Sequence, residues 1–100
     1  MGHLVRDITE TSVIYVAICR HCNAYKIGTS NNLRTRVKQL KTANPYLTVL
    51  YVGRGSYLME AHFHKLFSDK RIRGEWFNLS SEDIRILIEG FEFQNIAQWQ

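Results

Sequence analysis

Five polar side chains in this sequence are of the types found in enzyme sites that hydrolyse phosphate esters. They are Tyr15, Lys26, Arg36, Glu60 and His64. In phosphodiester hydrolysis a carboxylate holds a divalent metal ion, a tyrosine or a metal-activated water acts as the base, and an arginine or lysine stabilises the developing negative charge. The five residues are far apart along the chain, so this chemistry requires a fold that brings them together.

The same residues also have purely structural interpretations. Arg36 lies three residues after Leu33 and four before Leu40, so its side chain flanks an apolar helical stripe and needs an anionic partner. A buried ion pair between Arg36 and Glu60 would satisfy both side chains and join two helices without any catalysis. Tyr15 could equally be a core residue whose hydroxyl is satisfied inside the protein.

The strands that must position Tyr15 and Lys26 are visible as β-branched and aromatic segments. Residues 12–18 predict a central strand because both of its faces are mostly apolar, and residues 24–28 predict a second strand. The five-residue link between them suits a hairpin. A third strand is predicted over residues 47–52, and the polar segment 69–77 is expected to be a connection.

Helices are predicted over Asn31–Thr42, over Tyr57–Ser68 and after a capping box at Ser80–Asp83. The first of them carries a separate basic stripe, Arg34, Lys38 and Lys41, that we expect to face solvent. Glu60 and His64 share one side of the second helix because they are four residues apart. The order β-β-α-β-α-α predicts an α/β (α+β) fold, with a small three-stranded, mainly antiparallel sheet flanked by about three helices.

The composition is that of a single globular domain. One hundred residues can enclose only one core, so residues 1–100 are expected to form one domain that ends in a helix at 81–91 and a tail. The longest apolar run, Val13–Cys19, has seven residues and is too short to cross a membrane. We therefore expect no membrane association and a cytoplasmic location.

Basic residues are concentrated in the middle of the chain. Between Arg20 and Arg73, eleven basic residues oppose only Glu60 and Asp69, which gives a charge of +9, whereas residues 81–100 carry −3. A solvated basic surface would explain this asymmetry, and so would contact with an anionic partner such as nucleic acid.

The two cysteines, Cys19 and Cys22, are the only ones in the chain and cannot form a disulfide framework. With His21 between them they could begin a zinc site, but a closed structural zinc site needs four ligands and no second cysteine pair exists. Two reduced thiols in a hairpin loop are therefore the favoured interpretation.

Five short segments resemble motifs of the GIY-YIG nuclease superfamily, specifically its bacteriophage T5 Orf172-type DNA-binding domain branch. They are Val13-Ile-Tyr15, Lys26-Ile-Gly28, the basic segment Ser30–Pro45, the acidic segment Met59–Phe67 and Arg73-Gly-Glu-Trp-Phe77. Each segment alone is a weak signal, but all five occur in order between residues 13 and 80. The resemblance implies a GIY-YIG-like fold and a DNA-binding endonuclease, a hydrolase.

The resemblance also implies a role for each candidate residue. Tyr15 would be the general base or would orient the attacking water, and Arg36 would contact the scissile phosphate. Glu60 would be the only protein ligand of one Mg²⁺ or Mn²⁺ ion, with His64 orienting it or touching phosphate. Lys26 would contact phosphate, and the DNA-binding set would comprise Lys26, Arg34, Arg36, Lys38 and Lys41.

Two positions depart from the motifs of the superfamily. Val13 stands where the first motif has glycine and adds bulk close to Tyr15, and Lys26 stands where the second motif has tyrosine. The Orf172-type branch commonly has lysine at the second position, and a cation beside a phosphate remains reasonable chemistry. The loss of that tyrosine nevertheless removes one candidate base, so that Tyr15 must act alone or through metal-activated water.

Three functions follow from this reading of the sequence. The first is a metal-dependent endonuclease acting on DNA, with double-stranded DNA favoured. The second is a DNA-binding module on the same fold without catalysis, and the third is a module that binds an acidic protein partner. The sequence leaves the oligomeric state open.

Overall fold

The computed structural model describes residues 12–91 and 93–97. The ends of the predicted domain, residues 1–11 and 98–100, lie outside the described residues. None of the helices in the described part is long and apolar enough to serve as a membrane-spanning segment.

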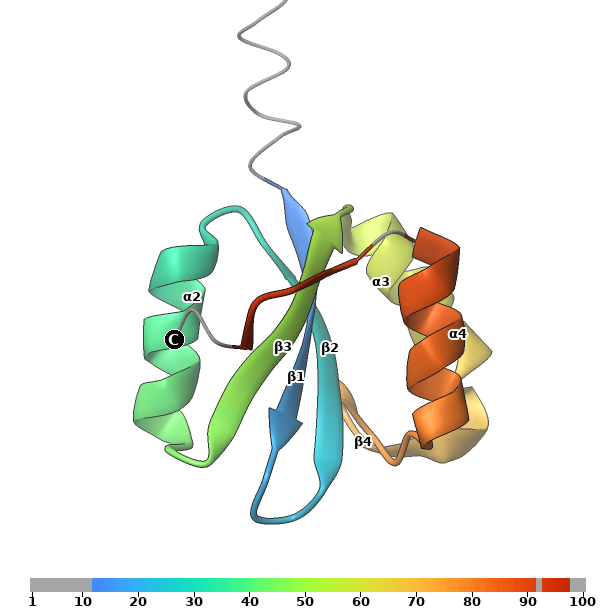
Figure 1. The fold of residues 1–100 in the computed structure, drawn as a ribbon, viewed down its shortest axis with the longest axis horizontal. Coiled ribbons are helices and arrows are strands. Elements are labelled where there is room, and N and C mark those ends of the chain that lie inside the picture. Colours follow the sequence, from blue (N-terminus) through green and yellow to red (C-terminus); the bar gives the residue numbers. More distant parts are fainter. Residues whose placement is uncertain (1–11, 92, 98–100) are drawn as a thin grey trace, which may run out of the picture.

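The centre of the fold is a six-stranded antiparallel sheet in the order β4-β5-β2-β1-β3-β6 (Figure 1). The strands are β1 Val13–Cys19, β2 Ala24–Ser30, β3 Leu47–Arg54, β4 Arg71–Arg73, β5 Trp76–Phe77 and β6 Gln94–Asn95. Strand β1 lies between β2 and β3, and residues 14–17 are fully buried within it. The prediction of a central first strand is therefore confirmed.

The predicted number of strands is wrong, because the sheet has six strands rather than three. The segment 69–77 was expected to be a connection, but it contains β4 and β5, which pair with each other and extend the sheet beside β2. Gly74 turns the chain between them with a φ of 56°. Strands of two or three residues are too short to show an alternating pattern, so the sequence carries little sign of them.

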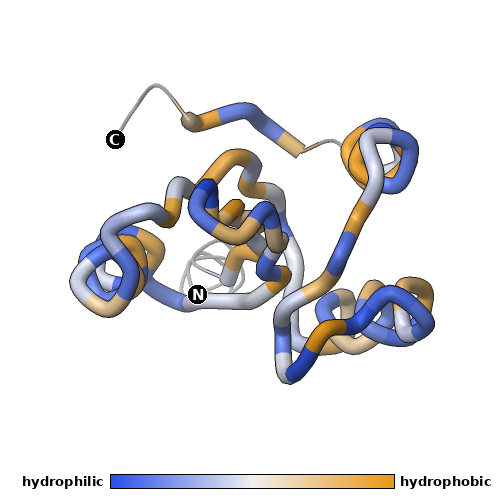
Figure 2. Tube along the Cα trace, turned by 90° about the horizontal axis from the view of Figure 1, so that it is seen from below, coloured by the Kyte–Doolittle hydropathy of each residue, from blue (hydrophilic) through white to orange (hydrophobic). Residues whose placement is uncertain are grey.

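Three α-helices lie in the described part, as predicted: α2 Leu33–Ala43, α3 Tyr57–Leu66 and α4 Ser81–Phe91. A single 3-10 turn, Ser68–Lys70, follows α3. Helix α2 covers one face of the sheet, and α3 and α4 cover the other, as two perpendicular views show (Figures 1 and 2). The fold is thus a helix–sheet–helix sandwich.

The alternation of side chains along β1 divides the core into two clusters. Ile14 and Val16 pack with the apolar residues of α3 and α4, among them Phe63 and Leu87. Tyr15 and its neighbours on the opposite face pack under α2. Because successive strand residues point to opposite faces of the sheet, residues adjacent in the sequence pack into different core clusters.

Helix α2 begins two residues later than predicted. The Asn32 side chain accepts a hydrogen bond from Thr35 N at 3.2 Å and caps the helix, while Ser30 Oγ accepts from Asn32 N at 2.9 Å. Asparagine and serine are equally favoured at the N-cap position. The residue types alone therefore do not show whether Ser30 or Asn32 caps the helix. The predicted stripe Leu33, Val37 and Leu40 does pack against the sheet.

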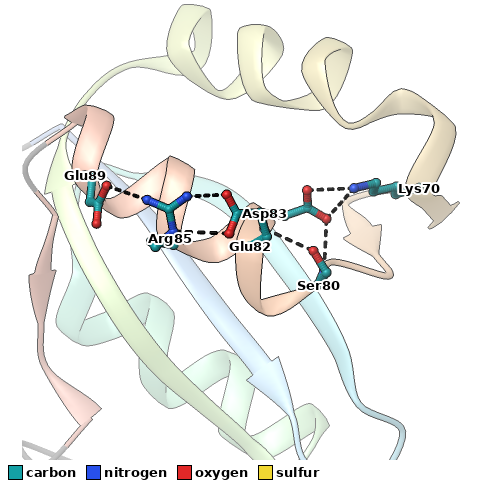
Figure 3. A network of polar contacts seen from close by, with 6 residues as sticks. All are labelled: Lys70, Ser80, Glu82, Asp83, Arg85 and Glu89. Atoms are coloured by element: carbon teal, nitrogen blue, oxygen red, sulfur yellow. Dashed lines mark hydrogen bonds and ion pairs between the residues drawn. The ribbon is translucent and has the colours of Figure 1, made fainter.

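The capping box predicted at the start of α4 is confirmed (Figure 3). Ser80 N donates to Asp83 Oδ2 at 2.9 Å, and Asp83 N donates to Ser80 Oγ at 3.1 Å. Lys70 Nζ adds a hydrogen bond to Asp83 Oδ1 at 2.6 Å, which ties the start of α4 to the end of the 3-10 turn. Further along α4, Arg85 pairs with Glu82 and Glu89 on the exposed side.

Candidate functional site

Tyr15 lies at the centre of the sheet, under α2, and its side chain is completely buried. It pairs with Gly28 on β2, and a Cβ atom on Gly28 would lie 2.6 Å from Tyr15 Oη. The glycine of the second motif therefore makes room for the tyrosine of the first. The hydroxyl is buried and has no hydrogen-bond partner among the described residues.

The surroundings of Tyr15 raise the pKa of its hydroxyl above the usual value of 10.0. Burial is the largest cause, and the negative charges of Glu75 and, more weakly, Glu60 act in the same direction. Arg36 opposes them through its charge and its hydrogen-bonding potential, and so lies close to the hydroxyl. At neutral pH the Tyr15 hydroxyl therefore keeps its proton.

Lys26 lies two residues before Gly28 on the same face of β2. Its ammonium group contacts Glu75 Oε1 at 2.8 Å and lies 5.5 Å from the centre of the Trp76 ring. Both residues come from the segment that was predicted to be a connection and that pairs with β2. The Lys26 side chain is 15% exposed, so its charge is neutralised at the edge of the α2 face.

The predicted basic residues of α2 differ in exposure. Arg34 and Lys38 are exposed, while Arg36 and Lys41 are partly buried. Arg36 points toward the sheet, as its place beside the apolar stripe predicts, and its charge reaches the Tyr15 hydroxyl. Helix α2 contains no acidic residue, so all of its charged side chains are cationic.

Glu60 and His64 lie on α3, which covers the opposite face of the sheet. Thr29 Oγ1 donates to Glu60 Oε1 at 2.9 Å, and Glu60 Oε2 lies 3.8 Å from His64 Nε2. His64 Nε2 lies 3.0 Å from the carbonyl oxygen of Ile27. Because a carbonyl oxygen only accepts hydrogen bonds, Nε2 carries a proton, and the ring is fixed beside Glu60.

The structure thus places the five candidates in two groups, with Tyr15, Lys26 and Arg36 beneath α2 and Glu60 and His64 on the α3 side. Both groups lie beside the end of β2, where Tyr15 pairs with Gly28 and Glu60 accepts a hydrogen bond from Thr29 on the other face. Strand β5 reaches only as far as a hydrogen bond from Ile27 N to Glu75 O, and no described strand continues beyond it along the edge formed by 28–30. Glu60 accepts a hydrogen bond from Thr29 within this segment. The negative charge of Glu60 also contributes to the raised pKa of Tyr15.

The ion pair proposed between Arg36 and Glu60 as a structural alternative does not form in the described part of the chain. The side chains that the described structure places against the Glu60 carboxylate are those of Thr29 and His64. Nothing in the sequence indicated that Thr29 bonds Glu60 or that Lys26 bonds Glu75. A strand of two residues positions Glu75, so no pattern in the sequence could have indicated its partner.

The Glu60 carboxylate is a reasonable ligand for Mg²⁺ or Mn²⁺, but it lacks the neighbouring ligands that a zinc site needs. No group of three or more histidine, cysteine or acidic residues is close enough to hold a metal in the part of the chain that the structure describes. Mg²⁺ is commonly bound by one or two carboxylates together with substrate phosphates and water. The Tyr15 hydroxyl and the nearby Arg36, on the opposite face of the sheet from Glu60, are groups that suit a phosphate.

One family model, that of the T5orf172 domain, matches residues 12–92. No curated protein and no solved structure matches the chain. The T5orf172 domain is associated with a nuclease-related superfamily of the GIY-YIG and HNH-like kind, which indicates a nuclease-like or DNA-binding module. Since the match covers most of the chain and every described helix and strand from β1 to α4, this chain belongs to the T5orf172 domain family.

Proposed function

We propose that this domain binds double-stranded DNA along α2 and hydrolyses a phosphodiester bond at the end of β2 with one Mg²⁺ or Mn²⁺ ion. The observation that carries the proposal is the Tyr15 hydroxyl, which is buried beside Arg36 and makes no hydrogen bond of good geometry to it or to any other described residue. Leaving a buried hydroxyl unpaired costs about 1–3 kcal/mol, and such groups in native proteins are often functional. A phosphate oxygen or a water molecule bound there would satisfy it.

DNA binding is supported by the charge of α2. Arg34 and Lys38 are exposed on one helix face, with Lys41 one turn further on. Side chains of this kind contact phosphates, which position a duplex without reading its sequence. We therefore expect this domain to bind DNA with low sequence specificity.

The raised pKa of Tyr15 favours one of its two possible roles. A general base must give up its own proton near neutral pH, and the surroundings of Tyr15 oppose this. Its hydroxyl instead donates a hydrogen bond and orients water or a phosphate oxygen. Arg36, beside it, stabilises the negative charge that develops on the phosphate.

Glu60 would hold the metal ion. A divalent cation bound there would supply positive charge to the scissile phosphate and activate a water molecule. Thr29 donates a hydrogen bond to one oxygen of the carboxylate and the His64 ring lies 3.8 Å from the other, so the ligand is oriented before any ion arrives. His64 acts as a positioning residue because its Nε2 proton is engaged by Ile27 O.

A second function, DNA binding without hydrolysis, is favoured by the contacts that already engage the candidate catalytic side chains. Lys26 is already neutralised by Glu75, and Glu60 already accepts a hydrogen bond from Thr29. The Tyr15 hydroxyl has no exposed surface. A domain that only grips DNA through α2 needs none of these groups to be free.

Nicking of supercoiled plasmid in the presence of Mg²⁺ or Mn²⁺ separates the two functions. We expect the wild-type domain to nick DNA, Glu60→Gln to lose nicking while it still binds, and Arg36→Gln to weaken both. Arg85→Gln, on the opposite layer, is the control and should behave as wild type. Binding without any metal-dependent nicking would leave the binding module as the function, and equal nicking by Glu60→Gln would exclude Glu60 as the ligand.

A further inference from the structure

The turn between β1 and β2 holds the two cysteines on one side of the chain. Asn23 N donates to Cys19 O at 2.8 Å, which closes a single helical turn, and Asn23 ends it with a φ of 60°. Residues three apart in such a turn are neighbours. In an ideal helical turn the Cα atoms of such residues lie about 5 Å apart, within the range of about 4.4–6.8 Å that a disulfide requires.

The turn is anchored to the segment after α2. Arg20 N donates to Tyr46 O at 3.0 Å, and the His21 ring stacks on the Tyr46 ring with centres 4.9 Å apart. Tyr46 N donates to Asn44 Oδ1 at 3.0 Å. Because the oxygen of the Asn44 side chain is engaged in this way, its NH₂ group is the part left to donate to Cys19.

The two sulfur atoms have different surroundings. Cys19 is buried, and hydrogen bonding from Asn44 and then from Cys22 lowers its pKa to about 7 against the opposing effect of burial. Cys22 is exposed, and its interaction with the Cys19 sulfur raises its pKa. The lowered pKa favours the thiolate form of Cys19, which accepts a hydrogen bond from the Cys22 thiol.

A pocket of about 380 Å³ opens beside the exposed thiol. Its lining residues are Cys22, Ala24, Asn44, Ile72, Arg73 and Trp76. Its size falls at the lower end of the range for small-molecule sites. Arg73 supplies a cation at its wall and Trp76 a flat apolar surface, which together suit a small peptide with carboxylate groups.

We propose that Cys19 and Cys22 are a thiol–disulfide exchange site whose oxidant is an acidic low-molecular-weight disulfide. Cys22, having lost its proton to solvent, attacks one sulfur of that disulfide, and the other sulfur leaves as a thiolate. The Cys19 thiolate then attacks Cys22 Sγ and releases the second thiolate. The protein loses two electrons and two protons, and the small disulfide becomes two thiols.

The surroundings favour this chemistry over metal binding. The chain has only these two cysteines. Among the described residues, no group of three or more histidine, cysteine or acidic side chains lies close enough together to hold a metal ion. The proposal does not depend on DNA binding or cleavage, since the turn and the pocket involve neither Tyr15 nor Glu60.

The test uses the full chain equilibrated with oxidised and reduced glutathione in varied ratio. After an acid quench, free thiols are alkylated and the intact mass is measured. We expect both cysteines to become protected together, with the mass of the protein lower by two hydrogens, and reduced glutathione to reverse the change. If both thiols remain free in excess oxidised glutathione, or the wild-type protein retains bound glutathione, the proposal is wrong.

Two cysteine variants identify the roles of the sulfurs. Cys19→Ser should hold glutathione as a stable mixed disulfide on Cys22, because nothing remains to displace it. Cys22→Ser should stay unmodified, because Cys19 is buried. Circular dichroism checks that both variants fold. Glutathione bound to Cys19 in Cys22→Ser would reverse the assigned roles and refute the mechanism.

Arg73→Gln tests the preference for an acidic oxidant. Loss of one partly solvated charge contact should slow oxidation by glutathione disulfide about two- to fivefold. The reaction with cystamine, a disulfide that carries amines in place of carboxylates, should not slow. Equal slowing of both reactions, or of neither, would show that the pocket does not select acidic disulfides.

Discussion

The Tyr15 ring fills the space that a side chain on Gly28 would need. A Cβ atom there would lie 2.6 Å from Tyr15 Oη and 2.7 Å from Cζ. Both atoms belong to a rigid, fully buried ring, so neither can move aside cheaply. We expect Gly28→Ala to lower the free energy of unfolding by about 1–3 kcal/mol through overpacking, measured by urea denaturation.

Gly90→Ala is the matched control for that substitution. Gly90 lies in α4, and nothing lies within 4 Å of the Cβ it would gain. Alanine is the better helix former by about 1 kcal/mol, so this variant should be slightly more stable than wild type. If Gly28→Ala matched wild type in its urea midpoint, the close approach of Tyr15 to β2 would be in doubt.

Removing the Tyr15 hydroxyl separates stability from function. The hydroxyl is buried without a partner in the described chain, so its desolvation is uncompensated. Tyr15→Phe should raise the free energy of unfolding by about 1 kcal/mol and, because it removes a hydrogen-bond donor to the reacting phosphate, reduce nicking of plasmid DNA by about 100-fold or more. Urea denaturation and the nicking assay on the same preparation test this. A variant that is both less stable and fully active would contradict both assignments.

Residue types could be predicted from the sequence, but their partners could not. The place of Arg36 beside an apolar stripe indicated correctly that it turns inward, and its charge does reach Tyr15. The partners of Lys26 and Glu60 are Glu75 and Thr29. These depend on the register of a two-residue strand and on which sheet face α3 covers, and neither leaves a pattern along the chain.

At the scale of elements, the start of α4 is held by one carboxylate. Burial raises the pKa of Asp83, but hydrogen bonds from Lys70 and Ser80 outweigh it and leave the pKa below its usual value (Figure 3). A carboxylate whose pKa is lower in the folded than in the unfolded state stabilises the fold above the unfolded pKa. That stabilisation is lost as the pH falls through the folded pKa.

We therefore expect Asp83→Asn to lower the free energy of unfolding by about 1–3 kcal/mol at neutral pH. The difference from wild type should begin to shrink below about pH 4, where Asp83 of the unfolded chain takes up a proton, and be smallest once the pH is below the lower pKa of Asp83 in the folded state. Urea denaturation across the acid range measures both effects. Glu82→Gln, on the exposed side of the same helix, should change neither the stability nor its pH profile. A difference for Asp83→Asn that is constant with pH would mean that its charge is not involved.

Long elements were predictable and short ones were not. Strands β1, β2 and β3 and the helices have enough residues for a period of two or 3.6 to appear. β4, β5 and β6 have two or three residues each. They form because neighbouring strands offer unpaired backbone groups, and that is a property of the folded sheet. The strands that the sequence did not predict matter for the candidate site, because β5 contains Trp76 and directly follows Glu75, and both of these residues contact Lys26.

At the scale of the whole molecule, charge is separated between the two helical layers. Helix α2, whose charged residues are all basic, lies on one side of the sheet, and α4, with three acidic residues and one arginine, lies on the other (Figure 1). An approaching DNA duplex would therefore be attracted to the α2 side and repelled by the α4 side. This orientation follows from the sandwich and could not be derived from the net charge of +4.

The salt dependence of DNA binding tests that orientation with a pair of variants of equal charge. Lys38→Gln on α2 and Arg85→Gln on α4 each lower the net charge by one unit, and both side chains are exposed. If Lys38 contacts a phosphate, its loss should weaken binding and reduce the slope of log affinity against log salt by about 0.9. Arg85→Gln should leave the slope unchanged, because the side chain lies on the far layer and is engaged by Glu82 and Glu89. Fluorescence anisotropy of a labelled duplex between low and moderate salt measures both slopes, and equal losses in the two variants would show that net charge, and not the α2 face, holds the DNA.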